Sequence, residues 1–388
     1  MRFLARERAV LEQFLPGLDD ALADVPLADL EGSAALGIPL LRDAGGAGLV
    51  IPVEYKGKGA NALDAVRIQR ALGSRSPSLA VASTMHHFSV SSLVLLAETG
   101  GKEWLVLEAI SAKNMLVASG FAEGRPDGHI LTPTMDATVT ADGVRVSGTK
   151  RPCSLARSMD LLTASLRLPS PDGRGDRLAV ALIPADDPGV TVAPFWSSFA
   201  LAGAESDQVT IDDVLVPADL VVLTEVTEDG RLDAVQTAGF VWFELLMAAS
   251  YLGAASALVE RVLSVERSAD VERMQLVSRT ESAHAAIENI ARQVPHAQTD
   301  AGLLADTLLV RYAVQDTIAS VVPRAVELLG GMNFMTSDDV GYLAAAVNGL
   351  GFHPPSRTRM AGPLTRYFAG SPRQITGRAK TDGREKGT

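Results

Sequence analysis

Two features near the C-terminus have the residue types and spacing of an active-site wall. A glycine pair, Gly330-Gly331, ends a long apolar-patterned segment, and a later loop holds His353 followed by two prolines. Glycine has no Cβ, so it can end a helix with positive φ and lets a flat ligand approach the backbone. Consecutive prolines stiffen the loop that carries the titratable imidazole. The pattern predicts either one wall of a site or an ordinary helix C-cap.

The pair His86-His87 is a second candidate for proton transfer, because the chain has only six histidines. An imidazole can accept or donate a proton near neutral pH. Neighbouring residues of a helix point about 100° apart. No carboxylate or cysteine is suitably spaced, so we do not expect a metal site. The alternative is a pair of buried or capping histidines.

Glu244 is a third candidate, because it lies inside a strongly apolar run from Val241 to Met247. A buried carboxylate must be paired or must have a raised pKa, and both conditions are common in active sites. The run therefore predicts either a general base or a structural partner for an arginine.

The composition excludes several classes of protein. With 388 residues, 47% hydrophobic and 21% charged, the chain is long enough for two or three domains of an ordinary globular protein. The net charge of -11 argues against nucleic-acid binding. A single cysteine, Cys153, excludes an internal disulfide framework. We recognise neither a signal peptide nor an uninterrupted apolar run of ~20 residues, so we expect a cytoplasmic protein with no membrane contact.

Three zones of different periodicity must position the candidate residues. Residues 1–112 have helical spacing, 113–225 alternate with period two, and 226–371 return to helical spacing. Residues 372–388 are polar and rich in Gly, Lys and Arg, so a disordered tail is expected. The expected helices are Phe3 to Leu15, Ala62 to Leu72, Val90 to Glu98, Lys102 to Ala112, Thr237 to Arg267, Leu276 to Gln293, Gly302 to Leu329 and Val340 to Val347. The expected strands are Ala137 to Thr140 and Val144 to Val146, joined by an Asp-Gly turn, then Leu161 to Leu166, Leu178 to Ile183, Val190 to Ala193 and Val209 to Val214.

Three motifs in this order resemble the acyl-CoA dehydrogenase family, over the chain to about residue 370. They are the segment from Gly148 through Lys150 to Ser154, the β-domain end from Gln208 to Pro217, and Glu327-Leu328-Leu329-Gly330-Gly331. The resemblance implies an α+β fold with an N-terminal helical domain, a middle β-barrel-like domain and a C-terminal four-helix bundle. It also implies a homodimer or homotetramer.

The resemblance implies FAD as cofactor and assigns residues to it. Ser154 stands where the family has a hydroxyl near the flavin ring, and Ser119 lies in another flavin-contacting segment. Gly330-Gly331 belongs to the part that receives the FAD of a partner subunit. Arg267 matches the arginine of the adenosine-side motif, whose Phe-Gly is lost here. The alternative for both serines is a local role at strand ends.

Two departures from the family concern the catalytic base. The usual Glu position falls on His353, and two prolines replace the Gly-Thr that follows it. Some family members carry the base on the first long C-terminal helix, and that position falls on or beside Glu244. The Trp beside the flavin is replaced by Pro152.

The leading expectation is α,β-dehydrogenation of an acyl thioester, bound to CoA or an acyl carrier protein, with Glu244 or His353 as base. An electron-transfer flavoprotein, or O2, would then accept the electrons. The first alternative is a flavin-dependent monooxygenase or oxidase on the same fold, with His86 or His87 approaching the substrate. The second is a catalytically inactive flavin- or acyl-binding homologue.

Overall fold

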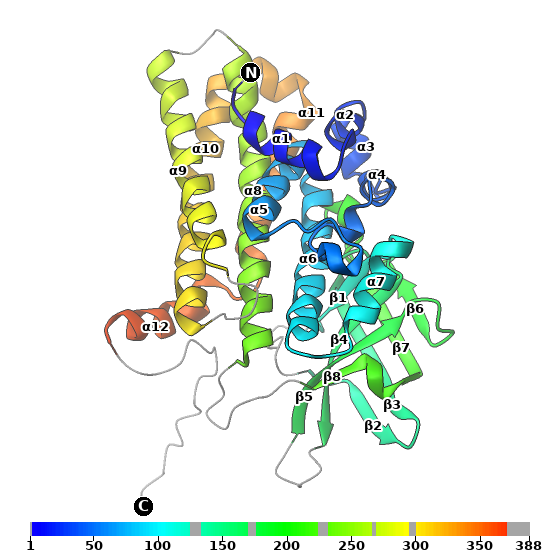
Figure 1. The fold of residues 1–388 in the computed structure, drawn as a ribbon. Helices are drawn as coiled ribbons and strands as arrows, with labels where there is room; N and C mark the ends of the chain where they lie inside the picture. Colours follow the sequence, from blue (N-terminus) through cyan, green and yellow to red (C-terminus); the bar gives the residue numbers. More distant parts are fainter. Residues whose placement is uncertain are drawn as a thin grey trace, which may run out of the picture.

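The computed structural model describes residues 2–124, 133–169, 176–223, 232–265, 269–294 and 300–370 (Figure 1). Within these ranges, helices form both ends of the chain and strands form the middle. The expected α+β fold is therefore confirmed, with helical N- and C-terminal parts. The predicted tail, 372–388, and Arg267 lie outside the described residues.

The N-terminal part is built around two long helices, α5 and α6. Helix α5 begins with a capping box, in which Asn61 and Asp64 each accept a hydrogen bond from the other's backbone N–H. Helix α6 begins at a Ser76 cap with Pro77 in its first turn. The sequence predicted only the second half of α6, because its first half is buried all round and shows no amphipathic stripe. The helices are α1 (Ala5–Phe14), α2 (Leu18–Ala23), α3 (Leu27–Glu31), α4 (Gly37–Asp43), α5 (Ala62–Arg75), α6 (Pro77–Glu98) and α7 (Trp104–Lys113).

The middle part contains two four-stranded sheets, ordered β1-β4-β5-β8 and β2-β3-β7-β6. The predicted hairpin is confirmed, since Thr140 pairs with Gly143 across the β2–β3 turn. Strand β1 runs parallel to β4, and the other pairs are antiparallel. The strands are β1 (Val117–Gly120), β2 (Asp136–Thr140), β3 (Gly143–Cys153), β4 (Leu161–Pro169), β5 (Asp176–Pro184), β6 (Val190–Ala193), β7 (Asp207–Val216) and β8 (Val221–Leu223).

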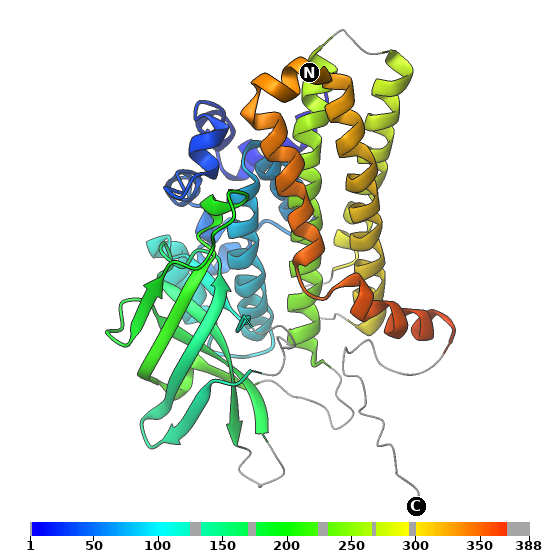
Figure 2. The ribbon, with the colours of Figure 1, turned by 180° about the vertical axis from the view of Figure 1, so that it is seen from behind.

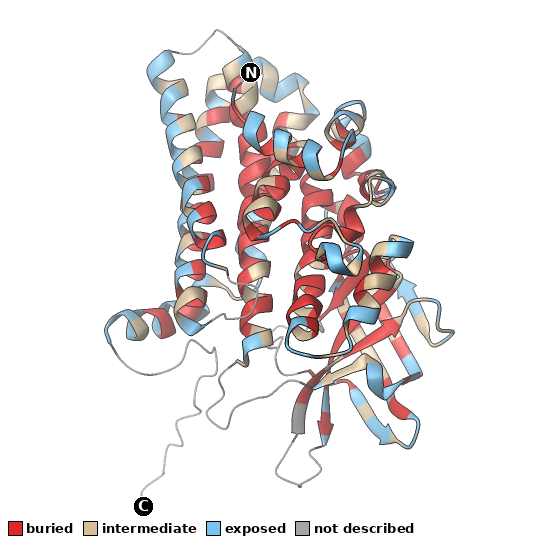
Figure 3. Ribbon diagram, in the orientation of Figure 1, coloured by how far each residue is buried: buried red, intermediate tan, exposed pale blue. Residues whose placement is uncertain are grey.

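Helix α8 is the central helix of the molecule. It packs against α5, α6, α9 and α10, and Figure 3 shows it buried along almost its whole length. Small residues permit the close approach of α5, because a Cβ on Gly73 would lie 2.1 Å from the Ser250 carbonyl oxygen and one on Gly253 would lie 2.3 Å from that of Arg70. The C-terminal helices are α8 (Ala234–Ser264), α9 (Asp270–Ala291), α10 (Ala301–Thr336), α11 (Asp338–Ala346) and α12 (Arg357–Phe368).

Helices α6 and α8 are long and apolar enough to cross a membrane, by length and composition alone. Most of each is buried inside the folded chain, however, with 94% of the apolar window of α8 covered by other residues. Packing in the core accounts for that composition.

Candidate functional site

A cavity of about 650 Å³ lies where α6, α8 and the two sheets meet. From the side of α9, Figures 1 and 2 show α8, then α6, then the sheets. The volume of the cavity is within the ~300–1,000 Å³ range of small-molecule sites. The 3₁₀ helix Val347–Phe352 and the loop after it close another side. Its helical wall consists of Val81, Met85, Phe88, Ser89, Ser92, Leu93, Leu96, Val235, Gln236, Gly239, Phe240, Phe243 and Tyr251.

The helical wall is mostly apolar, because each helix presents one stripe of its surface to the cavity. On α6 the stripe recurs at helical spacing, with Met85, Phe88 and Ser92 on successive turns. The ring of Phe88 meets that of Phe243 on α8 with centroids 5.4 Å apart, and that of Phe121 beyond β1 at 6.2 Å. The first contact is edge-to-face and the second is tilted, and aromatic pairs prefer such arrangements over a face-to-face stack.

The sheet wall of the cavity carries hydroxyl groups. Ser119 on β1, Ser154 after β3, Thr163 on β4 and Ser206 before β7 all line it. The hydroxyls of Ser154 and Ser206 lie 2.9 Å apart, so one proton of the pair is left for a ligand. The structure thus brings the two predicted serines together on one wall. Sequence reasoning missed Ser206 and Thr163, for which no motif gave a signal.

His353 is the predicted residue that the structure places most directly at the cavity. Its Nε2 lies 2.9 Å from the Tyr251 hydroxyl, and its ring packs edge-on against Phe243. The half-buried position of the ring, with a smaller effect of the nearby Arg311 charge, lowers the pKa of His353 to about 4. Burial also raises the pKa of Tyr251, so this phenol keeps its proton. At neutral pH the pair is therefore an uncharged imidazole beside an uncharged phenol.

Arg311 on α10 holds the loop that carries His353. Its guanidinium donates hydrogen bonds of 2.8 Å to the carbonyl oxygens of Leu350, His353 and Pro355. Its side chain is almost fully buried, at 1% exposure. Because the three acceptors span the loop, Arg311 holds it along its length, and the Tyr312 hydroxyl adds a second hydrogen bond to the Pro355 carbonyl oxygen.

Glu244 pairs with Arg311 and does not line the cavity. A carboxylate oxygen of Glu244 lies 3.1 Å from Arg311 Nε, and both side chains are buried. Burial raises the pKa of Glu244 to about 8, although the Arg311 charge acts in the opposite direction. The structure therefore places Glu244 behind the His353 loop, in the arginine-partner position that the sequence left open as its alternative to a base.

The histidine pair on α6 does not reach the cavity, which corrects the expectation that one of the two would approach a substrate. His86 accepts a hydrogen bond from the Val117 N–H at Nδ1, and its Nε2 lies 2.9 Å from the Ala47 carbonyl oxygen. These contacts fix the tautomer with the proton on Nε2, and burial lowers the pKa of His86 to about 4. His86 therefore joins the start of β1 to the loop around Ala47.

We expect His86→Leu to lower the free energy of unfolding by roughly 1–3 kcal/mol, because it leaves a buried N–H and a buried C=O without a partner. His87→Leu is the matched control. His87 is equally buried, but its ring nitrogens have no hydrogen-bond partner among the described residues. Chemical denaturation of both variants measures the difference. Equal losses would contradict the assigned role of His86.

The glycine pair lies away from the cavity. Gly330 has φ +84° and interrupts α10, as its lack of a Cβ predicts. The residues that follow expose apolar side chains, including Met332 and Phe334. The expected contact of Gly330-Gly331 with the cofactor of a partner subunit stays a prediction.

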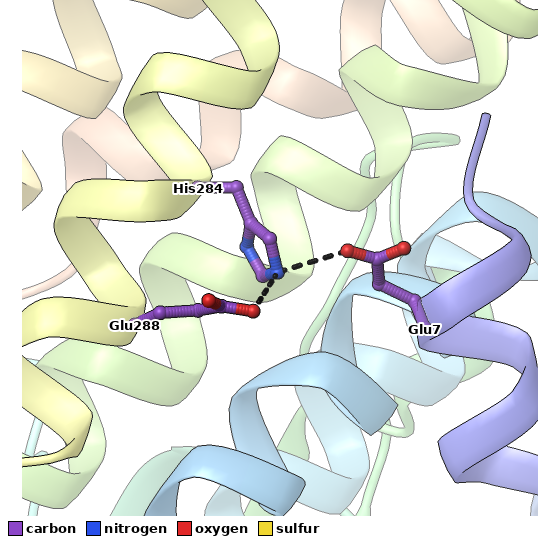
Figure 4. Close-up of side chains that lie close together, drawn as sticks. All are labelled: Glu7, His284 and Glu288. Atoms are coloured by element: carbon purple, nitrogen blue, oxygen red, sulfur yellow. Dashed lines mark ion pairs between the residues drawn. The ribbon is translucent and has the colours of Figure 1, made fainter.

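A second cluster of titratable groups joins α1 to α9 (Figure 4). The ligand atoms of Glu7, His284 and Glu288 lie within 4.8 Å of one another, as in a metal site. Guanidinium groups already pair with the carboxylates, however, since Arg70 lies 3.2 Å from Glu7 and Arg67 lies 2.8 Å from Glu288. Burial alone would raise the pKa of Glu7, but the His284 contact and the Arg70 charge hold it well below its usual value. We interpret the cluster as an ion-pair network that fastens α1 to the bundle.

Comparison with known proteins gives a relative along the whole chain and several structures of the same fold. No family model matches the chain. The chain is 45% identical to isobutylamine N-hydroxylase from Streptomyces viridifaciens over 379 residues, which cover 97% of this chain and 100% of that protein. The structure of KijD3 in complex with FMN and dTDP-3-amino-2,3,6-trideoxy-4-keto-3-methyl-D-glucose matches with TM-score 0.82 and 21% identity, over 95% of both chains. FMN-bound TdsC, a dibenzothiophene monooxygenase from Paenibacillus sp. A11-2, matches with TM-score 0.77 and 18% identity, over 95% of this chain and 98% of that one.

Proposed function

Since the chain belongs to the family of flavin-dependent monooxygenases that includes isobutylamine N-hydroxylase, we propose that it uses a reduced flavin and O2 to N-hydroxylate a small apolar amine. The observation that carries the proposal is the 45% identity along the full length of that relative. The monooxygenase alternative therefore replaces acyl thioester dehydrogenation, which was our leading expectation.

The cavity also argues against the dehydrogenase reaction. Removal of an α-proton needs a base within reach of the substrate. Among the described lining residues there is no Asp or Glu, and Glu244 faces Arg311 behind the loop. His353 lines the cavity, but with a pKa of about 4 it is too weak a base to remove the weakly acidic α-proton of a thioester. We therefore do not retain an acyl carrier protein, CoA thioester or electron-transfer flavoprotein as partner.

The sheet wall supports the proposed flavin. An isoalloxazine ring has a polar edge of nitrogens and carbonyls and a hydrocarbon edge opposite. We propose that Ser119, Ser154 and Ser206 hold the polar edge, because their hydroxyls share one wall of an otherwise apolar cavity. The flavin would supply the activation of O2, and the protein would supply position and exclusion of water.

The chemistry of the proposed reaction balances with three reactants. One oxygen atom of O2 forms the new N–O bond, and the other leaves as water. The reduced flavin gives two electrons and two hydrogens, and the amine nitrogen gives the remaining two electrons. A flavin reductase is the class of partner that would renew the reduced flavin. The KijD3 and TdsC neighbours hold FMN, so FMN and the expected FAD are both candidates for this chain.

The test supplies the protein with a flavin reductase, NADH, isobutylamine and isotopically labelled O2. FMN and FAD are compared in parallel. We expect a hydroxylamine with one labelled oxygen atom, detected by mass spectrometry, and no product without the protein. Anaerobic bleaching of the bound flavin by an acyl thioester would instead restore the dehydrogenase reading and overturn the proposal.

A further inference from the structure

The cavity has no charged side chain on any described wall. Among the described residues that line it, the titratable ones are His353 and Tyr251, which contact each other. Both are neutral at neutral pH, because burial lowers the pKa of the imidazole to about 4 and raises that of the phenol. The rest of the helical wall is uncharged, including the amide side chain of Gln236.

Titratable groups on the elements beside these walls have partners outside the cavity. On the sheet side, Glu205 and Asp207, which flank Ser206, pair with Arg157. From α8, the Glu244 carboxyl faces Arg311 of α10, and Arg311 also donates to three carbonyls of the loop. At the start of α8, the Asp233 side chain accepts a hydrogen bond from the Gln236 backbone N–H. On α6, His86 contacts Ala47 and Val117. None of these groups lines the cavity.

This wall is unfavourable for an ammonium ion. An alkylammonium has a pKa near that of lysine, about 10.4, so almost all of a free alkylamine is charged at pH 7. Burial of an ion without a counter-charge costs more than contacts with aromatic faces return. Phe88, Phe240 and Phe243 offer such faces, but the described lining has no carboxylate to pair with the ion. The uncharged amine avoids this cost and fills the apolar space.

We propose that the cavity binds its amine substrate as the uncharged free base and excludes the ammonium form. This inference rests on the proposed function and names the substrate class as apolar amines, with a preference for weakly basic ones. The free base is also the reactive form, since only its nitrogen has a lone pair for the new N–O bond. The ammonium loses its proton to solvent before the amine enters, so binding needs no side chain in the cavity to accept that proton.

The test measures binding to the protein loaded with oxidised FMN, where no turnover takes place. Isobutylamine is titrated by calorimetry at pH 7 in two buffers with different enthalpies of ionisation. We expect release of about one proton per amine bound, and an affinity that rises about tenfold per pH unit between pH 6 and 9. Isobutyl alcohol is the matched uncharged probe and should show neither effect. Binding without proton release, at an affinity independent of pH, would overturn the inference.

A pair of amines and one variant sharpen the result. Trifluoroethylamine is much less basic than ethylamine, so at pH 7 its apparent Kd should be lower by about the ratio of the free-base fractions. Equal apparent Kd values would contradict the inference.

Glu244→Gln, checked for folding by circular dichroism, should keep both affinity and proton release. Loss of binding in that folded variant would make Glu244 the counter-ion and overturn the inference.

The two proposals fail in different ways. If labelled hydroxylamine forms but amine binding is independent of pH, the inference fails and the proposed function stands. If no amine is hydroxylated although amines bind with proton release, the proposed function fails and the free-base reading of the cavity stands.

Discussion

Arg311→Met should lower the free energy of unfolding by roughly 3–5 kcal/mol, because it removes several buried hydrogen bonds from a charged donor, each worth about 1.5–3 kcal/mol. Methionine fills much of the volume but has no donor. The carbonyls of Leu350 and His353 would then lose this donor, that of Pro355 would keep the Tyr312 hydroxyl, and the carboxyl of Glu244 would face no cation. Urea denaturation with and without flavin measures this loss.

Arg311→Met should also lower the affinity of the cavity for its ligands, since the loop that it releases carries the lining residue His353. Arg311→Lys is the matched control, because it keeps the charge but loses the fork that reaches three acceptors. We expect Lys to fall between wild type and Met in stability. A stability loss below about 1 kcal/mol in the Met variant would show that the loop is held by other contacts.

The carboxyl of Glu244, the partner of Arg311, should make the free energy of unfolding depend on pH. The folded pKa of Glu244 is raised to about 8 from an ordinary value of 4.5. Its neutral form therefore favours folding, and this stability is lost as pH rises from about 4.5 to 8, by at most roughly 1.4 kcal/mol per pH unit. Glu244→Gln cannot ionise, so its stability relative to wild type should increase over that range. A constant difference across it would contradict the raised pKa.

His353→Phe should slow hydroxylamine formation by roughly 10²–10⁴-fold, the usual contribution of a positioned proton acceptor. When oxygen is transferred, the nitrogen carries one proton too many, and an N-hydroxy ammonium is a stronger acid than an alkylammonium. His353 is the imidazole that lines the described part of the cavity, and it is neutral above its pKa of about 4. A neutral ring nitrogen can accept that proton.

Tyr251→Phe is the comparison for this variant. It removes the hydroxyl 2.9 Å from His353 Nε2 but leaves the imidazole, so we expect a smaller loss than in His353→Phe. Single-turnover rates at saturating amine separate the chemical step from binding. The yield of hydrogen peroxide reports O2 that is reduced without transfer to the amine. A loss below about tenfold in His353→Phe would leave the ring with a packing role against Phe243.

Much of the fold and part of the site followed from local patterns. The Asp-Gly turn fixed the β2–β3 hairpin, and the apolar spacing of α8, α9 and α10 marked the C-terminal helices. The motif positions of Ser119, Ser154 and His353 proved to line one cavity. Turns and side-chain periodicity are set by residues close together along the chain, and the order of motifs can be read along it without knowing the fold.

Other assignments depended on contacts between distant segments. The sequence could not choose between a catalytic Glu244 and a paired one, because its partner, Arg311, lies 67 positions away on another helix. It could not place His86, since the groups that fix its tautomer come from the loop at Ala47 and from β1.

The sequence by itself determined that this chain has helical ends, a β middle and a histidine, His353, where its resemblance to the acyl-CoA dehydrogenase family leads one to expect a glutamate. Only the tertiary structure decided that Glu244 faces Arg311 and that the cavity beside His353 is uncharged. The physical reason is that periodicity records which face of an element is buried. The partner of a buried charge and the polarity of a cavity depend on which elements the fold brings together.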